Sequence, residues 1–371
     1  MRFLVRILAL ALLLSAGPAL AANPSAHIVI DADAGTVLSH SQADQLWYPA
    51  SITKVMTTYL TFQALKVGRI KPTSPVRISQ NALSQPPSKM GYKVGTVINV
   101  DNAIKMMIVK SANDIAVAIA EAVGGSEAGF VAMMNEEAQR LGMTSTHFSN
   151  PNGLPDDGQV TTARDLAVLA RAAWNDFPEY REYFRISAIR AGKRVLPSYN
   201  TLLERYRGTN GMKTGFICAS GFNMVASATR SGRTVIAVVL GESSALDRAE
   251  TAARLLAQGF RRGSLGVRPS LATFESAPVT GTPVNMREFG MCGKRQETEE
   301  DGANPVLAGM AKGSALEPRF FLMDPVPVYA GRADPPSGVA PTGKVPLPRL
   351  RPRPPGTSVA IEADGPPMLV H

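Results

Sequence analysis

The chain has 371 residues, 45% of them hydrophobic and 19% charged, which is enough for one large globular domain and a smaller segment. With two cysteines, four histidines and no HxxH or CxxC spacing, the sequence argues against metal chemistry, and no cofactor is expected. The formal net charge of +9 suits a protein that works near an anionic surface, such as a cell wall or lipid headgroups.

Residues 1–21 have the pattern of a secretory signal: a positive start, an apolar run over 7–14 and the small-residue cleavage site Ala19-Leu20-Ala21. The alternative, a membrane-spanning helix, needs about 20 apolar residues, and here Pro18 follows a shorter run. We therefore predict export with cleavage near Ala21, and a periplasmic protein that is in solution or peripheral to the inner membrane. Export also argues against nucleic acid, the usual partner of a basic chain.

Strands are predicted after the signal, and helices follow them. Residues 27–32 and 36–39 are β-rich runs on either side of Asp33-Ala34-Gly35, which indicates a hairpin. Apolar residues then recur at helical spacing from 50 to about 66, which places Ser51 in the first turn of a helix. Further helices are predicted over 100–107, 112–123, 127–141 and 162–174, with a surface loop of turn formers over 149–158.

Strand character returns later in the chain. Runs over 211–217, 222–229 and 234–240 are separated by glycine and serine breaks, and an amphipathic helix is predicted over 247–260. Strands at both ends with helices between them favour an α+β domain, in which one antiparallel sheet is covered by helices beside a helical lobe. We assign this domain to residues 22–262.

The chain after residue 262 is rich in Pro, Gly, Ala and Ser and lacks a periodic apolar run. We expect a small, poorly defined β module or linker over 263–330, and a disordered Pro/Arg-rich tail over 331–371 that carries part of the positive charge. Cys218 and Cys292 form either a disulfide, which export permits, or two unrelated thiols. The sequence leaves both interpretations open, because it does not place the two Cα atoms.

Three short strings carry the candidate chemistry: Ser51-Ile52-Thr53-Lys54, Ser111-Ala112-Asn113 and Lys213-Thr214-Gly215. On a helix, Ser51 and Lys54 share a face, so the lysine can take the proton of the serine hydroxyl. Lys54 must then be neutral, whereas a free lysine has a pKa of about 10.4. Burial and a second cation, Lys213, would lower that pKa. For an isolated SxxK string, the alternative is a helix cap followed by an exposed lysine.

The second string enters the helix predicted over 112–123. There Ser111 is placed to pass a proton to a leaving amine, and Asn113 to hold a substrate peptide. Both residue types are also common helix caps. A rival copy, Ser198-Tyr199-Asn200, has the same pattern, and we prefer Ser111 because it lies in the helical lobe with Ser51.

The third string opens a predicted edge strand, to which an extended peptide can add by main-chain hydrogen bonds. Lys213, Thr214 and Gly215 are therefore expected to bind substrate, with Thr214 receiving its terminal carboxylate. The backbone N–H groups of Ser51 and Phe216 are expected to stabilise the oxyanion. Without the other two strings, Lys213 would be interpreted as a turn residue before a strand.

The three strings resemble the motif set of the penicillin-binding protein and serine β-lactamase superfamily. Residues 48–54, 110–114, 210–215 and 221–228 look like those of low-molecular-mass D-alanyl-D-alanine carboxypeptidases of the peptidase S11 type, and the likeness covers about 27–260. It implies a five-stranded antiparallel sheet flanked by helices, and a role for Arg248 in holding the substrate carboxylate. Two features differ from that pattern. Phe216 stands where relatives often have histidine, and residues 364–371 lack the amphipathic character of a membrane anchor.

The resemblance implies a serine carboxypeptidase that trims the terminal D-alanine from peptidoglycan stem peptides and is acylated on Ser51 by β-lactam antibiotics. Alternatives on the same fold are a DD-endopeptidase, which uses identical groups, and a β-lactamase, for which the loop over 149–158 offers Asp156 and Asp157 but no glutamate. A non-catalytic cell-wall-binding protein is the alternative from another class. Intact Ser51 and Lys54 argue against it, because binding alone needs no nucleophile with its base.

Overall fold

The computed structural model of the chain describes residues 24–262, 268–274, 279–293 and 313–331, all within one compact unit. The predicted signal over 1–21, and the predicted tail apart from Gly331, lie outside the described residues. Among the residues described, no single helix is long and apolar enough to cross a membrane. The helices α4 (Asn113–Gly124) and α5 (Glu127–Leu141) meet the same length and composition criteria only when taken as a pair, bent by 82°.

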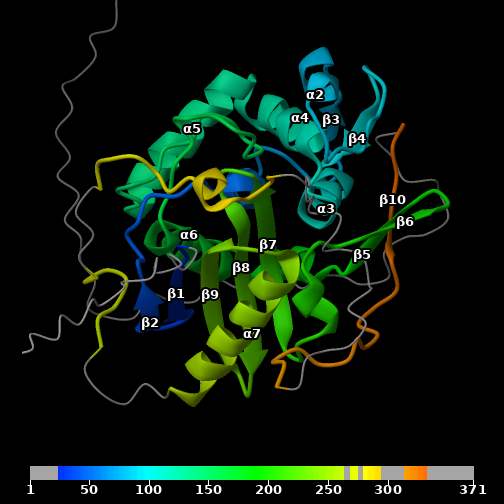
Figure 1. Ribbon diagram of the computed structural model, residues 1–371. Coiled ribbons are helices and arrows are strands. Elements are labelled where there is room, and N and C mark those ends of the chain that lie inside the picture. The colour runs from blue at the N-terminus through cyan, green and yellow to red at the C-terminus, as the bar shows by residue number, and fades with distance from the viewer. Residues whose placement is uncertain (1–23, 263–267, 275–278, 294–312, 332–371) are drawn as a thin grey trace, which may run out of the picture. The chain divides into compact units, whose positions relative to one another are not determined.

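A five-stranded antiparallel sheet has the strand order β2-β1-β9-β8-β7 (Figure 1). Two strands come early in the chain and three come late, and β1 pairs with β9, so the sheet joins the two ends of the domain. The predicted α+β class and its sheet are confirmed. The strands are β1 (Ala26–Asp31), β2 (Val37–Ser41), β7 (Thr209–Ile217), β8 (Gly221–Arg230) and β9 (Arg233–Glu242).

Helices cover both faces of this sheet, because its central strands send apolar side chains to both sides. Along β9, Ile236 and Val238 belong to one hydrophobic cluster, and Ala237 between them belongs to the other. The helix α7 (Ala245–Arg261) packs on the second cluster and crosses one face of the sheet in Figure 1. The helix α6 (Ala163–Asp176) contacts β1 and β9 from the first cluster. Burial on both faces explains why β9 is a continuous apolar run over 235–240.

The helical lobe connects the early and late strands. A 3-10 turn, η1 (Ala50–Thr53), precedes α1 (Lys54–Lys66), so the helix predicted from residue 50 becomes α-helical only at Lys54. The helix α5 has its predicted bounds because Ser126 caps its first turn and Gly142 ends it in the left-handed conformation. The other helices of the lobe are α2 (Gln80–Ser84), α3 (Val100–Val109) and α4.

Short elements complete the described chain, and the sequence does not predict most of them. The strand β10 pairs in parallel with β5, so a segment late in the chain belongs to the same compact unit as the domain. The domain boundaries at 262 and 330 stay a prediction. These elements are β3 (Pro75–Arg77), β4 (Val97–Asn99), η2 (Pro178–Arg185), β5 (Ala188–Ala191), β6 (Arg194–Pro197), η3 (Thr201–Glu204), η4 (Met286–Phe289) and β10 (Val326–Val328).

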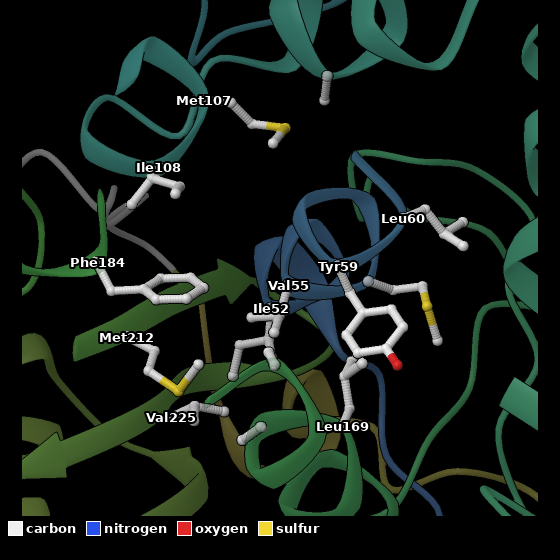
Figure 2. Close-up of a cluster of buried hydrophobic side chains, with 14 of the residues drawn as sticks. Ile52, Val55, Tyr59, Leu60, Met107, Ile108, Leu169, Phe184, Met212 and Val225 are labelled. Atoms are coloured by element: carbon white, nitrogen blue, oxygen red, sulfur yellow. The ribbon is translucent and has the colours of Figure 1, made fainter. Parts of the chain in front are cut away.

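A buried hydrophobic cluster joins the elements that carry the three strings (Figure 2). Val55 and Tyr59 of α1 belong to the same cluster as Ile108 of α3 and Met212 of β7. Burying each such side chain stabilises the fold by roughly 1.5–3 kcal/mol. The relative positions of the candidate functional groups therefore depend on this core.

Cys218 and Cys292 form a disulfide, with their Cα atoms 5.5 Å apart. Of the two interpretations that the sequence leaves open, the structure shows the crosslink. It joins the turn after β7 to the segment after η4, and a backbone hydrogen bond of 2.9 Å from Met286 N–H to Ala219 O lies beside it. This part of the region after residue 262 is thus tied directly to the sheet.

Candidate active site

Ser51 and Lys54 meet at the start of α1. Ser51 lies in the η1 turn, and Lys54 is the first residue of the α-helix. Lys54 Nζ lies 2.9 Å from Ser51 Oγ. The lysine is fully buried, whereas Ser51 is partly exposed. The candidate nucleophile can therefore be reached from solvent while its candidate base is shielded from water.

Two further oxygen atoms surround the Lys54 amine. Asn113 Oδ1 lies 2.8 Å from Lys54 Nζ, and the backbone oxygen of Asn152 lies 2.6 Å from it. Asn113 is the first residue of α4, so the second string reaches the first through this side chain.

The third string meets the second through Lys213. Its Nζ atom lies 2.9 Å from Ser111 Oγ and also donates to the Thr214 carbonyl at 2.8 Å. Ser111 has a φ of +58°, in the left-handed region that residues other than glycine adopt rarely. Such backbone strain persists where the surroundings hold a side chain in one place. Ser111 and Lys213 are both buried.

The Lys213-Thr214-Gly215 string lies in the middle of β7, not at its start as predicted, and β7 is the edge strand of the sheet. A Cβ atom added to Gly215 would lie 2.9 Å from the backbone nitrogen of Ser51, so only glycine lets the strand come this close to η1. Phe216 follows and stacks on Phe222, with 4.2 Å between the ring centroids. The predicted oxyanion donors, the N–H groups of Ser51 and Phe216, belong to the two segments that meet here.

Arg248 is buried, with 1% of its surface exposed, although composition alone indicates a surface residue of an amphipathic helix. Its Nη2 atom donates to the backbone oxygen of Tyr199 at 3.4 Å, and its guanidinium carbon lies 5.6 Å from the centre of the Phe222 ring. Because Phe222 also stacks on Phe216, Arg248 lies at the Phe216 end of the third string.

The rival string Ser198-Tyr199-Asn200 has a structural role. Asn200 caps η3 by accepting from Leu202 N–H at 3.2 Å, and Ser198 Oγ accepts from Asn200 N–H at the same distance. Tyr199 nevertheless borders the site, because its hydroxyl lies 2.7 Å from the Nζ atom of Lys110, the residue before Ser111.

The predicted surface loop over 149–158 is wrong in its first half. Pro151, Asn152 and Gly153 are buried, and only 155–158 are exposed. Gly153 has a φ of +84°, and a Cβ atom there would lie 1.9 Å from the backbone oxygen of Ala50. The loop thus packs directly against the turn that carries Ser51. Its turn-forming composition gives no sign of this burial.

Tyr48 is a titratable residue close to the turn that carries Ser51. Burial raises the pKa of Tyr48, just before the η1 turn, and the carboxylates of Asp157 and Glu288 raise it further. The phenol therefore keeps its proton at neutral pH. In the part of the chain that the structure describes, no group of three or more His, Cys, Asp or Glu side chains could hold a metal ion.

The sequence of this chain matches a known protein family. The peptidase S11 family model, described as D-alanyl-D-alanine carboxypeptidase, matches residues 15–244. This chain belongs to the peptidase S11 family. The match contains all three strings and ends before Arg248.

Individual proteins that are similar to this chain carry the same or related names. D-alanyl-D-alanine carboxypeptidase DacC of Escherichia coli strain K12 is 37% identical over 243 residues, which are 64% of this chain and 61% of the relative. The match thus spans less than two thirds of the relative's length. Penicillin-binding protein 5 from Haemophilus influenzae has a TM-score of 0.61 at 35% identity, covering 64% of this chain and 70% of that one. Penicillin-binding protein D2 from Listeria monocytogenes, in its cefotaxime-bound form, has a TM-score of 0.58 at 30% identity, covering 63% and 96%.

Proposed function

We propose that this chain is a serine-type D-alanyl-D-alanine carboxypeptidase that removes the terminal D-alanine from peptidoglycan stem peptides through an acyl-enzyme on Ser51. The observation that carries the proposal is a buried lysine amine 2.9 Å from the hydroxyl of a partly exposed serine, in a member of the S11 family. The Escherichia coli relative bears the name of this activity.

In this proposal Lys54 acts as the base in its neutral form, which burial favours for a lysine amine. A neutral amine has two hydrogens and one lone pair. Asn113 Oδ1 and the Asn152 carbonyl oxygen can only accept, so they take the two hydrogens. The lone pair then points to Ser51 Oγ and takes its proton as the hydroxyl attacks the carbonyl carbon of the penultimate D-alanine.

The same groups complete the acyl transfer. The N–H groups of Ser51 and Phe216 stabilise the oxyanion. As the peptide C–N bond breaks, Ser111 donates its hydroxyl proton to the departing amine of D-alanine and regains a proton from Lys54, which returns Lys54 to its neutral form. The Ser111 hydroxyl is held 2.9 Å from Lys213 Nζ. Water then hydrolyses the ester and restores Ser51.

Substrate binding follows from the third string and its neighbours. Lys213, Thr214 and Arg248 bind the terminal carboxylate, Asn113 holds the peptide, and Gly215 lets the peptide lie along the edge of β7. A β-lactam offers a carboxylate beside a reactive amide and acylates the same serine, as expected for a structural neighbour of a protein solved with cefotaxime. Residues 1–21 direct the chain to the periplasm, where these substrates lie.

The test is labelling with a fluorescent penicillin, followed by peptide mapping, together with D-alanine release from a pentapeptide. We expect an adduct on the peptide that contains Ser51, whereas Ser51→Ala should form no adduct and release no D-alanine. An unlabelled wild type, or D-alanine release by the variant, would contradict the proposal. Rapid repeated turnover of the penicillin would identify a β-lactamase, and cleavage of cross-linked muropeptides a DD-endopeptidase.

A further inference from the structure

Two loops from separate parts of the chain meet beside the Lys54 amine. One covers residues 150–153 and the other residues 85–91, directly after α2. Asn152 joins them: its backbone oxygen accepts from Lys54 Nζ at 2.6 Å, and its side-chain Nδ2 donates to Gln85 Oε1 at 2.9 Å. Asn152 is 1% exposed, so this side-chain amide is held away from water.

Asn113 makes the corresponding pair of contacts on the other side of the amine. Its Oδ1 accepts from Lys54 Nζ at 2.8 Å, and its Nδ2 donates to the Pro86 carbonyl at 2.9 Å. Gln85 and Pro86 are adjacent, so the contacts close into a ring that runs from Lys54 through Asn113, Pro86, Gln85 and Asn152 back to Lys54. Two adjacent residues, Gln85 and Pro86, thus contact the side chains of both residues whose oxygen atoms accept from the amine.

The loop over 85–91 is itself anchored to the second string. Asn113 N–H donates to the Ser88 carbonyl at 2.7 Å, and Ser88 Oγ donates to the Lys110 carbonyl at 2.9 Å. The buried carboxylate of Asp114 accepts from the N–H groups of Met90 at 3.0 Å and Gly91 at 2.8 Å. These bonds anchor the loop that carries Gln85, and Gln85 Nε2 also donates to the Asn81 carbonyl at 3.3 Å.

We propose that Gln85 is a positioning residue for the Lys54 amine. It holds Asn152 so that the Asn152 carbonyl keeps one N–H of Lys54 and the lone pair stays aimed at Ser51. The inference rests on the proposed function. Catalytic groups need to be held within about 0.5 Å of their productive positions by partners that do not react themselves. Gln85 acts through Asn152, so its loss slows acylation without weakening the binding that Lys213, Thr214 and Arg248 provide.

Gln85→Met tests this role, because it keeps the side-chain length and removes the oxygen that accepts from Asn152. We expect the rate constant for acylation by a fluorescent penicillin to fall about 10-fold, since small misplacements of catalytic groups cost up to about 100-fold. The noncovalent dissociation constant of the penicillin should stay the same. Gln80→Met, on the exposed first residue of α2, is the matched control and should acylate at the wild-type rate.

A double-variant cycle tests whether Gln85 acts through Asn152. Asn152→Ala keeps the backbone oxygen but removes the Nδ2 donor, so adding Gln85→Met to it should cause no further loss of rate. An unchanged rate in Gln85→Met, a weaker dissociation constant with an unchanged rate constant, or fully additive losses in the double variant would overturn the inference. Failure of the wild-type protein to form an adduct on Ser51 would instead overturn the proposed function.

Discussion

At the scale of single residues, two glycines let backbone segments approach the turn that carries Ser51. Gly215 brings β7 against this turn from one side, and Gly153 brings the buried loop against it. In both places the position of a side chain is taken by backbone atoms of η1, which cannot rotate away as the end of a flexible side chain can. The geometry of the nucleophile therefore depends on the absence of two methyl groups.

Gly153→Ala should lower both stability and the rate of acylation, and Gly142→Ala is its matched control. Both positions have positive φ, +84° and +75°, which costs an alanine roughly 1–2 kcal/mol. Only at Gly153 does the added Cβ also meet a backbone atom, 1.9 Å from Ala50 O, whereas nothing lies within 4 Å at Gly142. We expect Gly142→Ala to acylate normally and Gly153→Ala to acylate about 10-fold more slowly or worse.

Urea unfolding and penicillin labelling measure the two effects of these glycine variants separately. Equal losses of stability and equal labelling rates in Gly153→Ala and Gly142→Ala would show that the close approach to Ala50 does not matter.

At the scale of elements, one carboxylate joins β1, the turn to β2, and β9. Asp31 Oδ2 accepts from Arg233 Nε at 2.8 Å, and its Oδ1 accepts from the N–H groups of Asp33 and Ala34 at 3.2 and 3.1 Å. Burial alone would raise the pKa of Asp31, but the hydrogen bond from Arg233 and those from the turn outweigh it and hold the pKa below its ordinary value. The charged form of Asp31 is thus favoured by folding.

Asp31→Asn should therefore destabilise the protein in a pH-dependent way. A lowered carboxyl pKa stabilises the folded state above the ordinary value of about 3.9, and this stabilisation is lost as the pH falls through the folded-state pKa. At pH 7 we expect a loss of about 1.5–3 kcal/mol in the free energy of unfolding, the scale of a hydrogen bond to a charged group. Urea unfolding should show the difference from wild type shrinking as the pH is lowered below about 4. A difference that does not change with pH would exclude the charge of Asp31 as its cause.

Elements with signals at both ends could be predicted from the sequence, and elements that depend on distant partners could not. The helix α5 has an apolar period, a serine cap and a terminal glycine, all of which are local. The strands β5 and β6 have four residues each and contain Arg190 and Arg194, so no long apolar run marks them. They pair with each other, and β5 also pairs with β10, which is far away in the chain.

The same distinction applies within the candidate site. Ser51, Lys54 and Lys213 could be proposed because their side chains carry the chemistry. Asn152 could not, because it reaches Lys54 through its backbone oxygen, and every residue has one. The burial of Arg248 could not be predicted from the sequence either, because it contacts Tyr199 and Phe222, which are distant from it in the sequence.

At the scale of the whole molecule, the disulfide is the covalent link between the sheet and the segment after η4. Its cysteines are 74 residues apart. A disulfide typically stabilises a fold by about 2–4 kcal/mol, by restricting the unfolded chain.

Replacing both cysteines, as Cys218→Ser with Cys292→Ser, should lower Tm while Ser51 is still labelled by penicillin well below the transition. Thiol titration of the denatured, unreduced wild-type protein checks the starting state. Two reactive thiols per chain in that titration would contradict the crosslink.

The strand order limits when the domain can finish folding. The strand β1 lies between β2 and β9, and β9 ends only at Glu242, so the sheet cannot close until nearly the whole domain is available to fold. The lobe helices α4 and α5 are neighbours in sequence and contact each other, so they can form earlier, while long-range strand pairing is slow. Because Lys213 lies far after Ser51 in the chain, a chain that ends before β7 carries the serine without the complete site. Covalent labelling by penicillin is therefore also an assay for completed folding.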